Sequence, residues 1–175
     1  DDVAFVRQQV VMVLLQCDSV ALQKPMLSIV RVLGDTDFSA RWPELLPQID
    51  ILLDIARSPL HHACGALAVC REVARGFEFA LVPRSDDVEV FLQTVYPRML
   101  WIAKAALEAP PDNPDSALVL KLVVKVFWSC TAAPLRSGEP GLPPHLLESD
   151  RQEEWLTLLL SVMERPVPPP TEGSG

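Results

Sequence analysis

Histidine and cysteine spacing is the first place to look for chemistry in this chain. His61 and His62 are adjacent at a predicted helix start, and His145 stands alone in a Pro-rich loop. Adjacent helical positions point about 100° apart, whereas a helical zinc site needs two ligands four residues apart. Cys64 and Cys70 lie six residues apart, which does not match the spacing of zinc or redox motifs. The spacing therefore predicts no metal site.

The motifs of nucleophilic and phosphate chemistry do not occur in the sequence either. It contains neither the GxSxG turn of hydrolases nor the GxxxxGK[ST] loop that cradles phosphates, and it has only 7 glycines. Serine and threonine stand at predicted helix caps or on exposed helix faces. We therefore expect no catalytic residue and no cofactor. A small helical enzyme is the least favoured alternative.

The four cysteines, Cys17, Cys64, Cys70 and Cys130, stand among apolar residues at helical spacing. This setting is typical of buried free thiols in a reducing compartment. The sequence therefore predicts a packing role for them and no disulfide.

The net charge of −8 and the pI near 4.8 disfavour general binding to nucleic acid, because such a surface repels phosphate backbones. The same surface would attract basic proteins. Alternatively, the charge only keeps a helical protein soluble. No apolar run approaches the ~20 residues of a membrane span, so no membrane association is expected.

The two ends of the sequence resemble cut ends. Asp1 and Asp2 lead straight into an apolar helix, residues 166–175 form a polar, Pro-rich tail, and no charged-then-apolar leader indicates secretion. We expect an internal piece of a longer protein, although a trimmed sequence would look the same.

Apolar residues recur at helical spacing along the chain, and no stretch alternates with period two for long. The sequence therefore predicts an all-α fold. Ser19 and Ser39 are expected helix caps, Gly34 and Gly76 are expected stops, and Pro25 either kinks the second helix or marks a later start. Seven helices are expected, at about 3–16, 20–33, 40–57, 60–75, 87–108, 115–132 and 150–164.

Helices of this length, joined mostly by short loops, favour antiparallel pairs. Pairs that begin near residues 19, 59 and 113 give units of about 40 to 50 residues, the period of HEAT or armadillo arrays. The first helix would be the second member of a preceding pair. We therefore predict that residues 1–168 form an α-solenoid (superhelix) of about three and a half HEAT/armadillo-like helix pairs, with a concave surface, and that 169–175 form a Pro/Gly-rich tail.

One segment is more specific than the rest. The loop and helix start Phe38-Ser-Ala-Arg-Trp-Pro-Glu-Leu-Leu-Pro47 resembles a segment in an early HEAT repeat of the importin-β (karyopherin-β) superfamily of nuclear transport receptors. Segments at 119–128 and 154–168 follow in an order similar to that of the importin seven and importin eight branch. The resemblance covers about residues 3–168. The loop at 134–144 is longer than is usual there, and the long acidic loop expected further on is lacking. The receptor that exports importin-α therefore stays a competitor for the branch.

This resemblance implies a function that the residues alone do not give. Receptors of the superfamily bind Ran in its GTP form, bind cargo proteins on a concave face and bind nucleoporin Phe-Gly repeats on the outer face. They shuttle between nucleus and cytoplasm through the nuclear pore. This chain would supply roughly the third to fifth repeats, packed against flanking repeats. Import is favoured, and the alternatives are an exportin of the same superfamily or a HEAT scaffold without Ran binding.

Five residues are candidate contacts for such partners. The second helix of each pair lines the concave face of a HEAT solenoid, which would place the third, fifth and seventh helices there. Asp50, Asp54, Glu89 and Glu153 would then form an acidic strip for basic cargo or Ran, or else a plain solvated face. Trp101 lies on the polar side of the fifth helix, where it either packs on a neighbour or offers an aromatic contact.

The family-motif residues Arg41, Trp42 and Pro43 are interpreted as structural. A tryptophan before a proline at a helix start is a good wedge against the next repeat, and Pro43 would fall in a first turn, where its missing N–H costs little. A partner contact by Arg41 or Trp42 is the alternative.

Overall fold

Seven α-helices and one short 3₁₀-helix make up the part of the chain that the computed structural model describes, residues 2–17, 20–54, 56, 60–78, 80, 84–132 and 143–166. No strand occurs within these ranges, so the all-α prediction is confirmed. Ser19, most of the loop at 134–144 and the expected tail 169–175 lie outside them. The elements are α1 (Asp2–Gln16), α2 (Val20–Asp37), α3 (Leu45–Leu52), α4 (Leu60–Glu78), α5 (Ser85–Glu108), α6 (Pro114–Thr131), η1 (Pro144–Leu146) and α7 (Ser149–Glu164).

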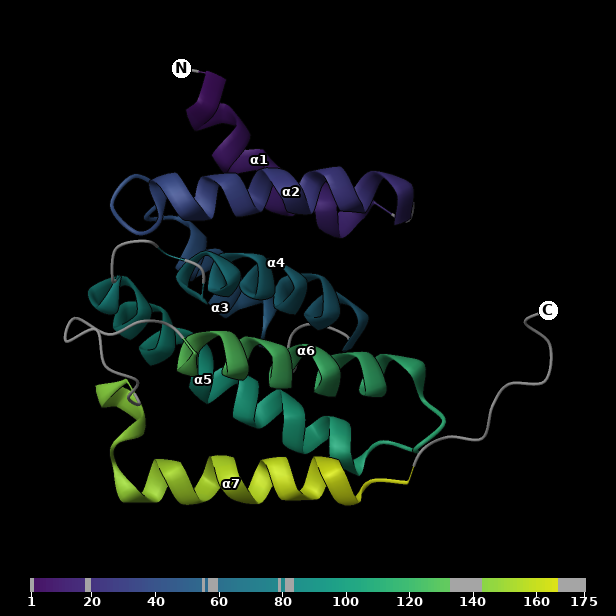
Figure 1. The fold of residues 1–175 in the computed structure, drawn as a ribbon. Helices are drawn as coiled ribbons and strands as arrows, with labels where there is room; N and C mark the ends of the chain where they lie inside the picture. Colours follow the sequence, from purple (N-terminus) through teal and green to yellow (C-terminus); the bar gives the residue numbers. More distant parts are fainter. Residues whose placement is uncertain are drawn as a thin grey trace.

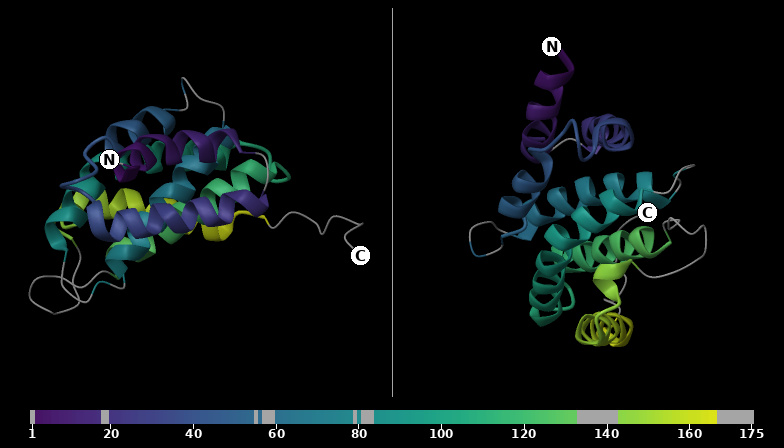
Figure 2. Two further views of the ribbon diagram at one scale, coloured as in Figure 1. Left: turned by 90° about the horizontal axis from the view of Figure 1, so that it is seen from above. Right: turned by 90° about the vertical axis from the view of Figure 1, so that its left-hand side faces the viewer.

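The helices stack from α1 and α2 at one end to α7 at the other (Figure 1, Figure 2). In one layer α4 packs along both α2 and α6, and in the other α5 packs against α3 and α7. Each helix thus contacts mainly its neighbours, as in a helical-repeat solenoid. The predicted α-solenoid of HEAT type is confirmed. Among the helices in the described ranges, none combines the length and the apolar character needed to cross a membrane.

Consecutive helices contact one another along the chain. α1 packs against α2, α3 against α4, α4 against α5 and, most closely, α5 against α6. α6 and α7 meet through Phe127 and Trp155, whose ring centroids lie 4.7 Å apart. Contacts of this kind occur both within the predicted pairs and between them, so the pairing that begins near residues 19, 59 and 113 stays a prediction.

The third helix is much shorter than the predicted 40–57 and spans Leu45–Leu52. Ser39 does not cap it, because both the backbone N–H and the hydroxyl of Ser39 donate to Asp87 Oδ1, at 3.3 and 2.9 Å. The chain turns through residues 38–44 instead, with Trp42 buried beneath it at 1% exposure. After the helix, Asp54 Oδ1 accepts a hydrogen bond from the Ala56 N–H, which ends the helical run.

Gly34 and Gly76 lie inside helices and do not end them. α2 continues through Gly34 to Asp37 and includes Pro25, so the alternative of a later start is wrong. α4 continues through Gly76 to Glu78. A Cβ on Gly34 would lie 3.4 Å from the Val73 backbone of α4, and one on Gly76 would clash with the Asp35 carboxylate of α2. Gly34 thus lies where the α4 backbone comes close to α2, whereas the neighbour of Gly76 is the end of an exposed side chain.

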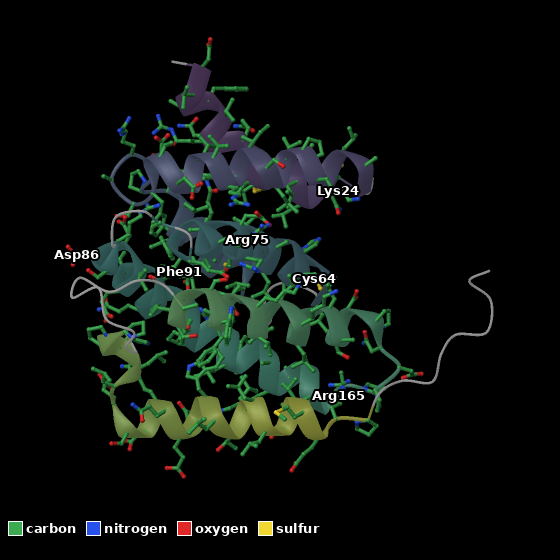
Figure 3. All side chains as sticks on the ribbon, viewed as in Figure 1. Lys24, Cys64, Arg75, Asp86, Phe91 and Arg165 are labelled. Atoms are coloured by element: carbon green, nitrogen blue, oxygen red, sulfur yellow. The ribbon has the colours of Figure 1, made fainter. Side chains whose placement is uncertain are left out.

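An arginine ties the end of α7 to the α5–α6 corner. Arg165 follows α7 directly, and its guanidinium donates hydrogen bonds to the carbonyl oxygens of Ala106, Ala109 and Pro110 and to Ser116 Oγ (Figure 3). These carbonyls belong to the last turn of α5 and the residues after it, which have no intrahelical donors. The contact fixes one end of α7 in the stack.

Within the described residues, Cys64, Cys70 and Cys130 are buried free thiols, and Cys17 is half-buried. Burial raises the pKa of the Cys64 thiol to about 11, and the pKa values of Cys70 and Cys130 rise further for the same reason. These three thiols stay protonated at neutral pH and behave as small apolar side chains.

Candidate protein-interaction surface

A groove of about 630 Å³ lies between α5, η1 and α7. Four of its lining residues come from α5 at intervals of four, Glu89, Gln93, Pro97 and Trp101, and so form one line along the helix. This is the polar side of α5 that contains two of the predicted contact residues. The structure therefore brings Glu89 and Trp101 to the same groove.

Aromatic rings from several elements form the floor of this groove. Tyr96 and Trp155 are buried at 1% and 2% exposure, and their ring centroids lie 4.6 Å apart. Phe127 of α6 stacks on Trp155 at 4.7 Å, and the His145 ring meets the edge of Tyr96 at 6.0 Å. Buried aromatic pairs of this kind stabilise a fold by more than the burial of their apolar area alone. The residues under the groove are therefore tightly packed.

Charges of both signs surround the floor. Lys104 Nζ lies 3.1 Å from Glu154 Oε1, and Arg151 Nε lies 2.8 Å from Glu148 Oε2. Glu89 accepts hydrogen bonds from the His145 backbone N–H and the Gln93 amide, each at 3.1 Å. The groove is thus not the purely acidic surface that the sequence predicted.

The surroundings of His145 favour the neutral form of its imidazole by lowering its pKa. Burial lowers the pKa of its imidazole, and the Arg151 guanidinium, with Nη1 2.6 Å from the ring Nδ1, lowers it further. Arg151 Nη1 lies 2.6 Å from both ring nitrogens, and the His145 backbone N–H donates to Glu89, so His145 links η1 to both α5 and α7.

Asp50 of α3 is held by an arginine of the same chain. Arg98 of α5 donates to both carboxylate oxygens, with Nε–Oδ1 2.7 Å and Nη2–Oδ2 3.0 Å. This hydrogen-bonded pairing lowers the pKa of Asp50 and raises that of Arg98. Asp54 is half-buried and caps the turn at Ala56. The two predicted acidic contacts on the third helix are therefore already engaged within the fold.

Glu153 lies elsewhere, in a second groove of about 430 Å³ between α5 and α7 that it shares with Lys104, Leu107 and Thr157. The five predicted contacts are thus distributed over the α3–α5 contact and two adjoining grooves. Arg98 and Arg151 were not anticipated, because an ion pair between distant helices leaves no local pattern in the sequence.

The family-motif residues take different positions. The Trp42 ring is buried, and its Nε1–H has no acceptor among the described residues. The Arg41 side chain is 74% exposed and only 4.0 Å from Asp37, while its carbonyl accepts from Arg7. Pro43 is exposed. This geometry supports packing by Trp42 and leaves Arg41 open to solvent.

Within the described ranges, no group of three or more His, Cys, Asp or Glu side chains is placed to hold a metal ion. His62 is exposed, and the side chain of His61 lies outside the described residues. The absence of a metal site stays a prediction.

A two-layer stack of short helices with shallow grooves defines an α-helical repeat protein of HEAT type, a class that works by binding other proteins. Comparison with known sequences narrows the class. The chain is 26% identical over 163 residues to an importin beta-like SAD2 homolog of Arabidopsis thaliana, across 93% of this chain and 15% of that protein. It is 24% and 23% identical over 143 residues to Importin-8 of mouse and of human, across 81% of this chain and 13% of each. The predicted resemblance to the importin-β superfamily, in the importin eight branch, is therefore confirmed.

These relatives are far longer than the chain, which spans 13–15% of their length. No family model matches the chain, and no solved structure matches it.

Proposed function

We propose that this chain is part of a nuclear transport receptor of the importin-β type, which binds proteins and moves them through the nuclear pore, with import as the favoured direction. The observation that carries the proposal is the similarity to an importin beta-like protein across 93% of the chain. The solenoid stack and its grooves support it, because such surfaces suit protein binding. The proposal includes no enzymatic step.

The proposed partners are Ran-GTP, basic cargo proteins, nucleoporin Phe-Gly repeats and the flanking HEAT repeats of a longer chain. The protein would then shuttle between nucleus and cytoplasm. Cargo and Ran-GTP would each lower the affinity of the other by the same factor, because coupling between two binding equilibria is reciprocal. The nucleotide state of Ran would supply the direction.

For basic cargo, the α5–η1–α7 groove and the adjoining groove at Glu153 are the proposed contact region. Trp101 is 42% exposed beside Glu89 and Glu154 and offers apolar area next to carboxylates. A cationic segment could bind the carboxylates at Glu153 without breaking an ion pair within the described residues, whereas binding at Asp50 would require displacing Arg98.

The test is binding of the natural protein that contains these residues to Ran loaded with GTP or with GDP. We expect a preference for the GTP form of about a hundredfold, ~3 kcal/mol. Adding cargo then separates an importer, in which cargo and Ran-GTP exclude each other, from an exportin, in which they bind together. Equal affinity for both nucleotide forms in a folded protein would exclude a transport receptor and favour a HEAT scaffold.

The contact region has its own test. Trp101→Ala combined with Glu153→Lys should weaken binding of a basic cargo peptide. Val90→Ala with Glu108→Lys serves as the matched control, because Val90 is 43% exposed and Glu108 is exposed, and neither lines the two grooves. Equal affinity of both double variants would rule out these grooves as the cargo site.

A further inference from the structure

The outward face of α6 carries a stripe that the proposed function does not use. Leu118, Lys121, Lys125 and Trp128 follow one another at intervals of three, four and three residues, which places them on one side of the helix. All four side chains are exposed, Trp128 at 64% and Leu118 at 40%. We call this set the α6 stripe.

Trp128 is the most exposed of the chain's four tryptophans. Trp42 and Trp155 are buried at 1% and 2% exposure, and Trp101 is 42% exposed in its groove. Tryptophan is enriched among residues that dominate protein interfaces, because its large ring buries much apolar area with little conformational freedom to lose. A ring left this open on a regular helix marks a contact surface.

The two lysines of the stripe have no ion-pair or hydrogen-bond partner among the described residues. The chain has four lysines, and the Lys104 ammonium, by contrast, pairs with Glu154 at 3.1 Å. Lys121 and Lys125 are four residues apart on the helix, so their charges repel each other across one turn. A negative partner would relieve that repulsion.

The neighbouring helix does not supply this negative charge. On α4, which packs along α6, Glu72 pairs with Arg75 at 3.5 Å. Glu78 accepts from the Ser129 hydroxyl at 2.7 Å and lies 3.7 Å from Arg71. Both carboxylates are thus committed within the fold. The α6 stripe is a local cationic surface on a chain of net charge −8.

The stripe is apolar at both ends and cationic in the middle. Trp128 lies at one end. At the other, Leu118 lines a groove of about 400 Å³ that α6 shares with α1, α2 and α4. Leucines such as Leu27 supply much of its lining, and Asp115 contributes an acidic residue. From Leu118 to Trp128 the helix advances about 15 Å, and the two lysines are separated by about 6 Å along its axis.

We propose that the α6 stripe binds an acidic protein segment in extended form, with two carboxylates at alternate positions and a large apolar residue on each side. Alternate residues of an extended chain lie about 6.6 Å apart on one side, which matches the axial separation of Lys121 and Lys125. The flanking apolar residues then reach Trp128 and the groove beside Leu118. Two lysines on an acidic protein are too few to hold a phosphate backbone.

The experiment measures fluorescence anisotropy of a labelled peptide, Leu-Ser-Asp-Ser-Asp-Ser-Leu, on the full chain. We expect saturable binding that weakens about tenfold, ~1.4 kcal/mol, when both aspartates are replaced by asparagine. The double variant Lys121→Glu/Lys125→Glu should lose at least as much affinity, and Trp128→Ala should weaken binding several-fold.

The matched control is Arg31→Glu/Arg41→Glu, which changes the net charge by the same amount at arginines outside the stripe and outside the three grooves. It should leave the affinity within about twofold, because at 0.15 M salt charges beyond roughly 8 Å are screened. Equal losses in both double variants would mean that only net charge matters and would overturn the proposal. So would an absence of binding by the unmodified chain, or tighter binding of a single-stranded oligonucleotide at the same stripe. The outcome does not depend on Ran or nuclear transport, so it is separate from the test of the proposed function.

Discussion

Breaking the ion pair between Asp50 and Arg98 should loosen the contact between α3 and α5. The pair is bidentate, at 2.7 and 3.0 Å, but its side chains are 39% and 35% exposed. Exposed ion pairs contribute about 0.2–1 kcal/mol, and bidentate geometry favours the upper part of that range. We therefore expect a coupling free energy of about 1 kcal/mol from a double-mutant cycle with Asp50→Ala, Arg98→Ala and the double variant.

The two single variants should not be equivalent. Arg98 is attracted by Asp54 as well as by Asp50, so Arg98→Ala removes favourable interactions with two carboxylates, whereas Asp50→Ala removes only one. Arg98→Ala should therefore destabilise the chain more than Asp50→Ala. Urea denaturation followed by circular dichroism gives both free energies of unfolding.

The contribution of Asp50 to the stability of the fold should depend on pH in a definite direction. The pKa of Asp50 is lower in the folded chain than in the unfolded one, chiefly because of the hydrogen bonds from Arg98. Its contribution to stability is therefore present above the unfolded pKa of about 3.9 and is lost as the pH falls through the folded pKa. The stability difference between the unmodified chain and Asp50→Ala should be constant from pH 7 to about 5 and shrink below about 4. A coupling free energy under about 0.3 kcal/mol, or a difference unchanged at pH 3, would refute the reasoning.

Three further results are expected. Trp155→Ala should lower the free energy of unfolding, measured by urea denaturation, by about 3–5 kcal/mol, because it leaves a cavity among the buried aromatic rings under the groove. Trp101→Ala should lower it by less than about 1 kcal/mol. Arg165→Ala should lower the free energy of unfolding by about 1.5–3 kcal/mol and raise the rate of amide hydrogen exchange in α7. An unchanged free energy of unfolding would contradict the hydrogen bonds assigned to Arg165. Cys70 and Cys130, whose pKa values burial raises, should resist a thiol reagent in the folded chain and react at pH 8 in urea, so fast labelling of the native chain would contradict their burial.

The helices themselves could be predicted from the sequence, because each buries one side and the apolar residues therefore recur at helical spacing. Their ends were harder to predict. Ser39 has the chemistry of a helix cap, but it bonds instead to Asp87, 48 residues away. Gly34 and Gly76 have the chemistry of helix stops, but both lie inside helices, and Gly34 faces the Val73 backbone of the neighbouring helix. At Ser39 and Gly34 a contact between distant residues overrides a local preference.

The candidate site was only partly predictable for the same reason. Periodicity placed Glu89, Gln93, Pro97 and Trp101 on one side of the fifth helix, and these residues do line one groove. Periodicity does not reveal which helix lies across the groove from the fifth one. That helix is α7, which contributes Arg151 and Glu154. Nor does it reveal that Asp50 already has a cationic partner in Arg98. A strip of carboxylates in the sequence is therefore not a free negative surface in the fold.

The close approach of α2 and α4 constrains how this chain can vary at Gly34. A Cβ there would lie 3.4 Å from both the backbone and the side chain of Val73, so alanine would just fit and larger side chains would push the two helices apart. At Gly76 a Cβ would meet only the end of the exposed Asp35 side chain, which can move aside into solvent. A single position that buries almost no apolar area would thus limit side-chain size and fix how closely α2 approaches α4.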